Sequence, residues 1–204
     1  MPRLAALVAL YTIGTLRPWQ VAAEAWAVAV VAADGLLAAV IGRTGYRGGE
    51  LVSKLNHLLL AQNLKQRMVS FALAEVETDL QQARITSAGH QPGVLLAAAG
   101  GVDEVLLCSL PLGHRWPDPP PDRTVPFAPG SRLLLYSDGL VEARDAQGSP
   151  FGYEKLRDAL LAHRAASGPQ LLAGLLAELD RHLSGTPLGD DLTVVLVEHR
   201  PATA

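Results

Sequence analysis

Five short apolar segments, separated by turn-forming residues, fill the middle of this chain and constrain its fold more than any other feature. They cover residues 68–76, 82–87, 94–98, 105–107 and 132–136. Glycines such as Gly89 and Gly100-Gly101 lie between them. Short strands joined by tight connections predict an antiparallel meander. Residues 117–121, Pro-Asp-Pro-Pro-Pro, predict a surface loop, because proline lacks the backbone N–H that helices and sheets use.

Helical periodicity flanks this strand region. The expected helices cover residues 50–61, residues 154–163 and a segment that begins with Pro169 in its first turn. Their apolar residues recur every three or four positions and therefore share one face. Two further apolar runs, residues 25–33 and 192–198, predict buried strands, the second in the centre of a sheet. Strands and helices in this order predict an α+β domain in which helices cover sheet faces.

Composition and charge exclude several classes of protein. Hydrophobic residues make up 49% of the 204 residues and charged residues 18%, which excludes intrinsic disorder. Seventeen Lys and Arg face 20 Asp and Glu without a basic run, so a nucleic-acid partner is not expected. The single cysteine, Cys108, cannot form an internal disulfide, which favours a cytoplasmic protein. We expect Cys108 to be buried as a small hydrophobic residue.

The N-terminal segment, residues 1–33, is apolar and carries only three charges. Residues 4–16 match a signal-peptide core weakly, because Tyr and Thr dilute them. Residues 21–41 are long enough to span a bilayer, but Glu24 and Asp34 lie within them, and unpaired carboxylates are costly in hydrocarbon. A strand followed by a helix is the favoured interpretation, with no membrane span.

Carboxylates lie beside glycine or another carboxylate at the ends of three apolar segments. These are Ala33-Asp34-Gly35, Ser137-Asp138-Gly139 and Gly189-Asp190-Asp191. Carboxylates that converge at a sheet edge repel one another unless a cation neutralises them. Oxygen ligands favour magnesium, manganese or calcium over zinc. Each segment alone is better explained as a turn or a helix cap.

Three longer blocks carry a resemblance to a known family. Residues 83–95 contain Ser-Ala-Gly-His-Gln-Pro-Gly, residues 133–144 contain Tyr-Ser-Asp-Gly-Leu-Val-Glu, and residues 189–197 begin Gly-Asp-Asp-Leu-Thr. In this order the chain resembles the metal-dependent protein serine/threonine phosphatases, in the bacterial branch of the sporulation stage II protein E and stress-response phosphatases. Shorter matches are Leu55-Asn56, Pro111-Leu112-Gly113, Pro129-Gly130 and Phe151-Gly152. The resemblance covers residues 34–198.

The resemblance implies a fold and a metal site. The fold is an antiparallel β-sandwich of two sheets flanked by helices, with two Mn²⁺ or Mg²⁺ ions at one edge. The residues that it implies as metal ligands are Asp34, the Gly35 carbonyl, Asp138 and Asp190. The residues that it implies as support for those ligands are Asp191, His90 and Gly139.

The resemblance also implies an activity. Two divalent cations about 3.5 to 4 Å apart activate a water molecule for attack on phosphorus, so no nucleophilic side chain is needed. The expected substrate is phosphoserine or phosphothreonine in a bacterial regulatory phosphoprotein, of the type that antagonises an anti-sigma factor. This phosphoprotein is the expected partner, and the sequence leaves the oligomeric state open.

The early motif departs from the family pattern. Asp34-Gly35 runs directly into Leu36, without the Gly-His-Gly or Lys-containing turn of the family, and residues 1–33 contain no Asp. Two alternatives therefore stand beside the active enzyme: a catalytically inactive phosphatase-like domain that binds a partner, and a truncated or misassigned N-terminus. The expected organisation is an atypical segment at 1–33 that contributes a strand, a phosphatase-like domain at 34–198 and a tail at 199–204.

Overall fold

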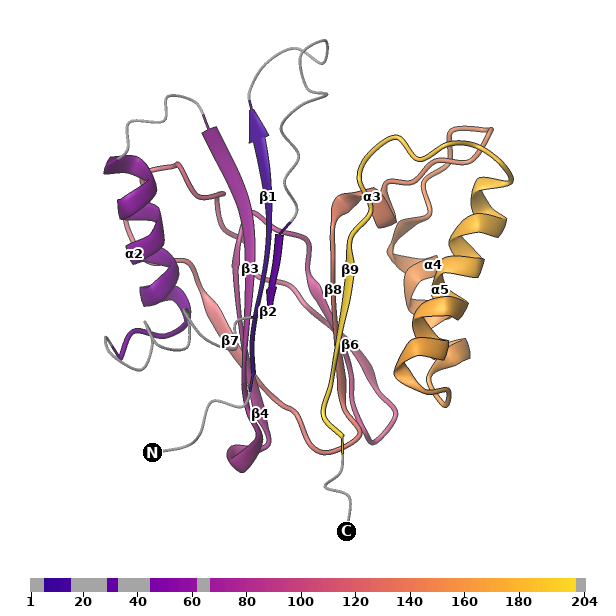
Figure 1. The fold of residues 1–204 in the computed structure, drawn as a ribbon, viewed down its shortest axis with the longest axis horizontal. Helices are drawn as coiled ribbons and strands as arrows, with labels where there is room; N and C mark the ends of the chain where they lie inside the picture. Colours follow the sequence, from indigo (N-terminus) through magenta and orange to yellow (C-terminus); the bar gives the residue numbers. More distant parts are fainter. Residues whose placement is uncertain (1–5, 16–28, 33–44, 62–66, 201–204) are drawn as a thin grey trace. The chain divides into compact units, whose positions relative to one another are not determined.

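The computed structural model describes residues 6–15, 29–32, 45–61 and 67–200 (Figure 1). The chain divides into two compact units. The first contains Met1–Pro92 and Val105–Ala128, and the second contains Gly93–Glu104 and Pro129–Ala204. Within the described residues, no helix is long and apolar enough to cross a membrane. The predicted domain bounds stay a prediction.

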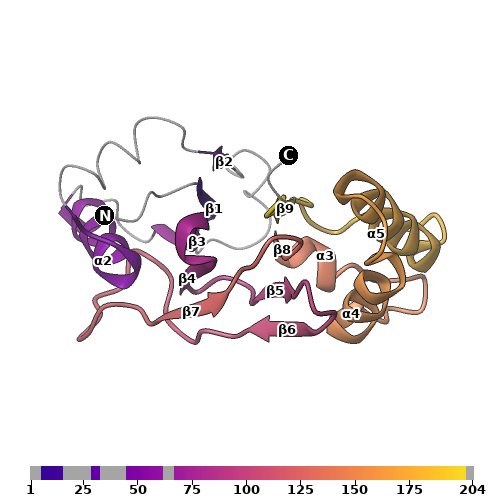
Figure 2. The ribbon, with the colours of Figure 1, turned by 90° about the horizontal axis from the view of Figure 1, so that it is seen from below.

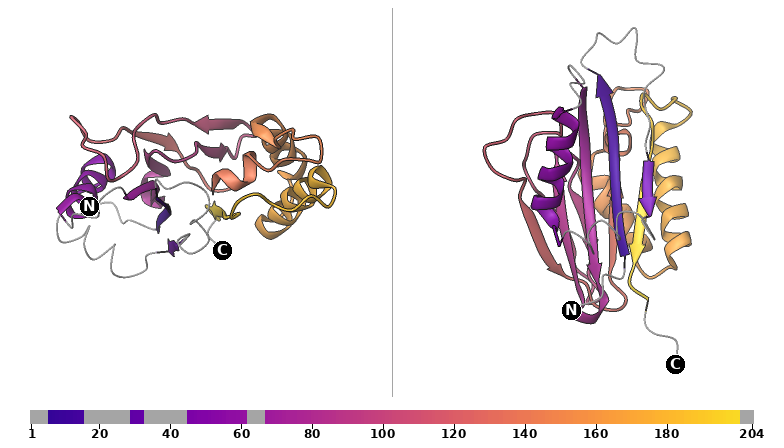
Figure 3. Two further views of the ribbon diagram at one scale, coloured as in Figure 1. Left: turned by 90° about the horizontal axis from the view of Figure 1, so that it is seen from above. Right: turned by 60° about the vertical axis from the view of Figure 1, so that its left-hand side comes forward.

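The first unit is built on a five-stranded antiparallel sheet with the strand order β2-β1-β3-β4-β7. Its strands are β1 (Ala6–Thr15), β2 (Ala29–Ala32), β3 (Arg67–Glu77), β4 (Gln82–Ala88) and β7 (Asp122–Pro126). The long strands β1 and β3 run side by side (Figure 3). A 3-10 turn, Thr78–Leu80, leads from β3 into β4, with Gln81 in the left-handed region.

Helix α2 (Gly48–Ala61) covers one face of this sheet. Its buried Leu51 and Val52 pack with alternate residues of β3, including Phe71 and Leu73. Because successive side chains of a strand point to opposite faces, one face of β3 meets the apolar face of the helix. Asn56 is also buried: its Nδ2 donates to the His114 carbonyl at 2.7 Å, and its Oδ1 accepts the Gly113 N–H at 2.7 Å.

The second unit has a four-stranded sheet with the strand order β6-β5-β8-β9. Its strands are β5 (Gly93–Leu96), β6 (Val102–Val105), β8 (Arg132–Tyr136) and β9 (Val194–Glu198). Its helices are α3 (Asp138–Val141), α4 (Gly152–His163) and α5 (Gly168–Leu183). Helix α3 follows β8 directly, and α4 and α5 lie side by side (Figures 1 and 2).

The core of the second unit lies between the sheet and the helix pair. Leu134 and Tyr136 of β8 pack in one cluster with Leu160 of α4 and Leu175 of α5, and all four are at most 1% exposed. A capping box begins α5, because the Ser167 N–H donates to the Gln170 side chain at 3.1 Å. The predicted proline lies in the first turn of this helix.

The predicted fold class is confirmed: the chain is α+β, with two antiparallel sheets and flanking helices. The three expected helices form within two residues of their predicted starts. Strand β8 has the predicted limits, and β3, β4 and β5 differ from theirs by one or two residues. The expected strand at residues 25–33 forms as β2, within the described part of that segment.

Several expectations were wrong in detail. The strands do not form one meander, because β7 pairs with β4 in one sheet whereas β8 pairs with β5 in the other. The strand expected at residues 105–107 is β6, which ends at Val105. Strand β9 lies at the edge of its sheet and is half-buried, not central. Cys108 is exposed, because it lies in the loop after β6 and outside either core.

Two strands had no counterpart in the sequence analysis. Strand β1 occupies the segment that was weighed as a signal-peptide core, where it pairs with β3 along its whole length. Strand β7 shows little apolar alternation, because Val125 is its only buried residue and it ends in proline. Its place at the end of the five-stranded sheet tolerates that proline.

Candidate metal centre

Asp138 lies where strand β8 ends and helix α3 begins. Three successive buried leucines, Leu133 to Leu135, and the buried Tyr136 hold the strand in the sheet. The backbone then turns at Ser137, so that Asp138 leaves the core half-exposed. One carboxylate oxygen of Asp138, Oδ1, lies 3.2 Å from the Gly139 N–H and accepts from it. The Asp138 carboxylate therefore keeps acceptor capacity for a ligand.

Asp190 and Asp191 lie on the segment that joins α5 to β9, and both are exposed. Asp190 Oδ1 accepts the Asp191 N–H at 2.7 Å. As at Asp138, the carboxylate bonds only the next backbone N–H among the interactions of the described residues. Asp190 is exposed, and its second oxygen makes no hydrogen bond to any described residue, so this carboxylate also keeps capacity for a cation.

The two aspartate segments are in contact. The Ser137 N–H donates to the Thr193 carbonyl at 2.9 Å, which continues the β8–β9 ladder by one pair. A Cβ on Gly139 would collide with the Asp191 carbonyl oxygen, so the backbones meet where only glycine fits. This contact joins the backbone segments that carry Asp138 and Asp190, which are 52 positions apart in the chain.

The donors present here suit a hard divalent cation. Carboxylate oxygens are ligands that Mg²⁺ and Mn²⁺ prefer. Within the described residues there is no group of three or more His, Cys, Asp or Glu side chains that could hold a metal. The described residues therefore supply two of the predicted carboxylates. Asp34 and Gly35, the other predicted ligands, lie outside the described residues.

His90 belongs to the first unit and lies in the turn after β4. Its backbone N–H donates to Ser87 Oγ at 3.3 Å, and its carbonyl lies 3.3 Å from the same hydroxyl. Gly89 has a φ of +65°, and a Cβ there would meet Pro111. These contacts are those of a tight, glycine-dependent turn. A supporting role of His90 toward the metal site stays a prediction.

Tyr136 immediately precedes the aspartate segment and is buried in the core of the second unit. It is 1% exposed, and its hydroxyl has no hydrogen-bond partner. Burial, together with the nearby Tyr153 and Glu104, raises the pKa of the Tyr136 phenol well above its ordinary value. The phenol therefore stays protonated and supplies no charge to the site.

A second pair of carboxylates, which the sequence analysis did not single out, lies in the first unit. Glu75 of β3 is 1% exposed, and its Oε2 accepts the Gly48 N–H at 2.8 Å. Asp122 Oδ2 accepts the Gly49 N–H at 3.2 Å. The two side chains thus cap the N-terminus of α2, where backbone N–H groups lack partners within the helix.

Charge around Glu75 supports the same structural role. Burial raises the pKa of Glu75, and the Gly48 N–H, Arg84 and Arg47 oppose that shift. Arg47 is 4.0 Å from Glu75 and makes a 2.6 Å ion pair with Glu77. The only sequence signal for this cap is a glutamate within an otherwise apolar strand.

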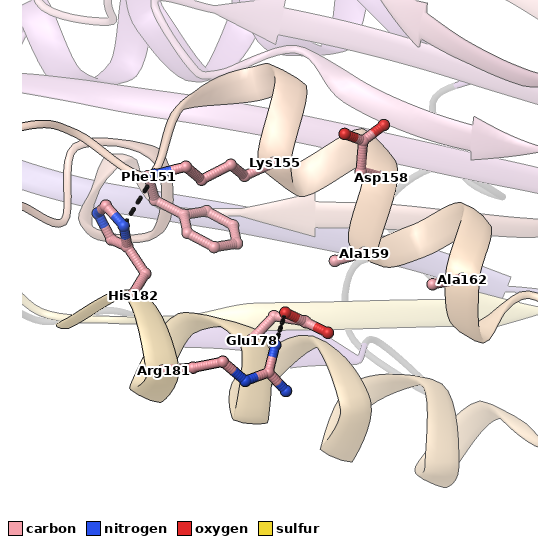
Figure 4. A pocket seen from close by; sticks show the side chains of 8 residues that line it. All are labelled: Phe151, Lys155, Asp158, Ala159, Ala162, Glu178, Arg181 and His182. Carbon is pink, nitrogen blue, oxygen red and sulfur yellow. Dashed lines mark hydrogen bonds and ion pairs between the residues drawn. The ribbon is translucent and has the colours of Figure 1, made fainter. Parts of the chain in front are cut away.

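A cavity of about 420 Å³ lies between α4 and α5 (Figure 4). Lys155 Nζ donates to His182 Nδ1 at 2.9 Å, so His182 Nε2 carries the proton that it directs at the Ala143 and Ser149 carbonyls, 3.2 and 3.1 Å away. His182 therefore ties α5 to the segment between α3 and α4. Glu178 and Arg181 pair with each other on the same wall. None of the predicted metal-site residues lines this cavity.

The sequence analysis missed Ser137 and Thr193. Ser137 is 3% exposed, and its Oγ donates to the Asp191 carbonyl and accepts the Thr193 N–H, both at 2.9 Å. The Ser-Asp-Gly and Asp-Asp-Leu-Thr motifs contain these residues. Nothing in either motif shows that the serine of one contacts the backbone of the other.

Comparison with solved structures identifies the fold. The SiaA-PP2C domain of Pseudomonas aeruginosa matches with a TM-score of 0.68 at 20% identity, over 94% of this chain and 81% of that chain. The PP2C phosphatase domain and regulatory fragment of SpoIIE from Bacillus subtilis match with a TM-score of 0.68 at 16% identity, over 98% and 56%. The RsbU and RsbW domains of Rv1364c from Mycobacterium tuberculosis match with a TM-score of 0.66 at 18% identity, over 100% and 62%.

No curated protein matches the chain. The family comparison, in contrast, covers most of it: residues 24–200 match the stage II sporulation protein E family. That range includes the strand-end aspartates, the contact between their segments and every strand of the two sheets except β1. The chain therefore belongs to the stage II sporulation protein E family and has the fold of PP2C-type phosphatase domains.

Proposed function

We propose that this protein hydrolyses phosphoserine or phosphothreonine in a bacterial regulatory phosphoprotein, with the help of divalent cations. The observation that supports the proposal is the backbone contact between the segments that carry Asp138 and Asp190, whose carboxylates each accept only the N–H of the next residue among the described residues. Family membership supports the same activity. The substrate class, an antagonist of an anti-sigma factor, follows from the family resemblance.

The residues would share the work as follows. Asp138 and Asp190 would bind a divalent cation through carboxylate oxygens that make no hydrogen bond to other described residues. When bound, a pair of divalent cations supplies an activated water and neutralises phosphate charge. The neutral phenol of Tyr136 and the leucines of β8 keep the aspartate segment anchored to an apolar sheet. No side-chain nucleophile is required of the chain.

Two neighbours support magnesium or manganese as the metal. One solved structure of this fold is RsbX in complex with magnesium, which matches with a TM-score of 0.56 at 16% identity. Another is the SpoIIE phosphatase domain from Bacillus subtilis presoaked with Mn, with a TM-score of 0.56 at 15% identity. We carry both metals over to this chain as part of the proposal, with Asp34 and the Gly35 carbonyl as the further ligands.

A second candidate function is a catalytically inactive domain that binds a partner. The observation in its favour is that the described residues group no three metal-binding side chains. The early motif lacks the Gly-His-Gly turn of the family, which also favours this alternative. In this alternative, Asp138 and Asp190 would serve only as surface carboxylates.

One experiment separates the two functions. Release of phosphate from a phosphoserine peptide is measured with the full chain in Mn²⁺, in Mg²⁺ and in excess chelator, for the parent, Asp190→Asn and Asp34→Ala. The enzyme predicts metal-dependent release that chelator abolishes and that both variants lose. An inactive domain predicts no release above the chelator control in any sample, with unchanged folding by circular dichroism.

A further inference from the structure

We infer that Ser137 is a positioning residue for the metal centre, because its hydroxyl fixes the Asp190 segment against the Asp138 segment before any cation binds. This inference rests on the proposed function. It assigns to Ser137 a role that the family comparison does not give. The role acts through the backbone of Asp191 and Thr193 and involves no contact with substrate or metal.

The hydroxyl of Ser137 is fully engaged by the opposite segment. Its Oγ donates to the Asp191 carbonyl at 2.9 Å and accepts the Thr193 N–H at 2.9 Å. With the backbone bond from the Ser137 N–H to the Thr193 carbonyl, three hydrogen bonds run from this one residue to a segment more than 50 positions away. Because Ser137 is 3% exposed, water cannot replace these bonds easily.

The ordinary explanation for a serine at this position does not apply. Ser137 is the N-cap residue of α3, and an N-cap serine normally accepts a hydrogen bond from the second or third helical N–H. Its side chain makes no such bond here. The hydroxyl is directed instead at the segment that carries Asp190.

Fixing that segment matters because it joins the β8–β9 ladder only at Thr193. Residues 184–193 form neither helix nor strand, and Asp190 and Asp191 are exposed. A ligand on such a segment loses conformational entropy when it binds a cation, unless the backbone is already ordered. Ser137 holds the Asp191 carbonyl, and Gly139 packs against that same oxygen. The peptide between Asp191 and Leu192, one residue beyond Asp190, is therefore held by both Ser137 and Gly139.

The other end of β8 offers a matched control. Ser131 immediately precedes the strand, is 2% exposed, and accepts the Ala98 N–H through its Oγ at 3.2 Å. Ser137 immediately follows the strand. Both serines are buried and hydrogen-bonded to backbone, but only Ser137 contacts the segment that carries an aspartate of the proposed site. A purely structural loss should therefore be common to both alanine variants.

The test is a Mn²⁺ titration of the metal-free full chain by calorimetry, for the parent, Ser137→Ala, Ser137→Thr and Ser131→Ala. Loss of a group that orients metal ligands typically weakens metal affinity about 10- to 100-fold. We expect that loss in Ser137→Ala, parental affinity in Ser131→Ala, and recovery in Ser137→Thr, which keeps the hydroxyl. Amide hydrogen exchange of the metal-free protein should show faster exchange at Thr193 in Ser137→Ala than in the parent.

Other outcomes overturn the inference in distinguishable ways. Parental Mn²⁺ affinity in Ser137→Ala, or equal weakening in Ser131→Ala, contradicts the positioning role and leaves the proposed function standing. A parent that binds no Mn²⁺ contradicts both. If Ser137→Ala does not fold, Ser137→Cys replaces it, because a thiol keeps the shape but is a weak hydrogen-bond partner. Parental affinity in that variant contradicts the inference equally.

Discussion

Each of the two units has a pair of carboxylates that accept backbone N–H groups of glycine or a neighbouring residue. One pair caps a helix, and the other is a candidate pair of metal ligands. Glu75 and Asp122 direct oxygens at the first N–H groups of α2. Asp138 and Asp190 each bond only the N–H of the next residue. The first pair holds the N-terminus of α2 through bonds to residues far away in the chain, whereas the second pair makes only local bonds and stays open to a cation. Acidic residues near one another are therefore candidate metal ligands where they hold no other element of the fold.

Burial and cations reinforce this difference. Glu75 is almost fully buried, and this burial raises its pKa although Arg47 and Arg84 lie nearby and oppose the shift. Asp138 is half-exposed and Asp190 is exposed. Neither aspartate takes part in an ion pair with another of the described residues. In the proposed function, a bound divalent cation balances the negative charge of these two carboxylates.

The largest expected effect is on activity at Asp138. Asp138→Asn keeps the shape of the side chain but removes charge that a cation needs, so Mn²⁺-dependent phosphopeptide hydrolysis should fall by roughly 100-fold or more. The melting temperature should stay close to that of the parent. Asp145→Asn is the control: Asp145 Oδ1 accepts the N–H groups of Gln147 and Ser149 in a surface turn. A parental rate in Asp138→Asn at saturating Mn²⁺ would remove Asp138 from the site.

A large effect on stability is expected at Glu75. Glu75→Ala leaves the Gly48 N–H without its acceptor in a buried place, which costs about 1 to 3 kcal/mol in the free energy of unfolding. Denaturant unfolding monitored by circular dichroism measures this loss. Mn²⁺ affinity should not change. Glu75→Gln keeps an acceptor oxygen and should lose less, and equal losses in the two variants would argue against the cap.

Two glutamates should respond to pH with opposite signs. Burial raises the pKa of Glu75 above 4.5, so the folded state binds that proton more tightly, and parental stability relative to Glu75→Gln should fall as pH rises above 4.5. Burial also acts to raise the pKa of Glu198, but hydrogen bonds from Arg200 and Arg132 outweigh it and lower the pKa. Parental stability relative to Glu198→Gln should therefore shrink as pH falls below 4.5. Thermal unfolding from about pH 2 to 7 measures both differences, and slopes of the same sign would contradict this account.

The smallest effect is expected at Asp122. It is exposed, and its 3.2 Å bond to the Gly49 N–H is longer than the Glu75 bond to Gly48. Asp122→Ala should cost about 0.5 to 1 kcal/mol, the lower part of the range for a helix cap. Urea unfolding beside Asp118→Ala, an exposed acidic residue of the Pro-rich loop, gives the comparison. A loss larger than that of Glu75→Ala would reverse the order of the two caps.

The sequence predicted those elements whose local pattern and tertiary environment agree. Strand β8 was located to the residue because three leucines lie between a Pro-Gly turn and an Asp-Gly turn, and all three are buried. The matched segments Leu55-Asn56 and Pro111-Leu112-Gly113 meet in the fold, because Asn56 bonds Gly113 and His114. Strand β9 was wrongly predicted to be central in its sheet, because apolar residues on both faces suit a half-buried edge strand as well as a central one.

The aspartates and the glycine of the candidate site could be predicted from the sequence, but the hydrogen bonds between its two segments could not. Asp138, Gly139 and Asp190 stand out in the sequence because each belongs to a strand-end motif. Ser137 belongs to the same motif, but its role does not show in the sequence, since its partner lies 54 residues away and is a backbone carbonyl. The α2 cap was equally hidden, because Glu75 acts through register and burial rather than through a motif.

The most direct measurement counts Mn²⁺ bound to the full chain by calorimetric titration in three proteins: the parent, the Asp138→Asn, Asp190→Asn double variant, and the Glu75→Gln, Asp122→Asn double variant. The parent is predicted to bind two ions per chain. The first double variant should bind none, and the second should match the parent while unfolding more easily. Equal binding in all three proteins, or loss in the Glu75 and Asp122 pair alone, would contradict the claim that the open carboxylates hold the metal.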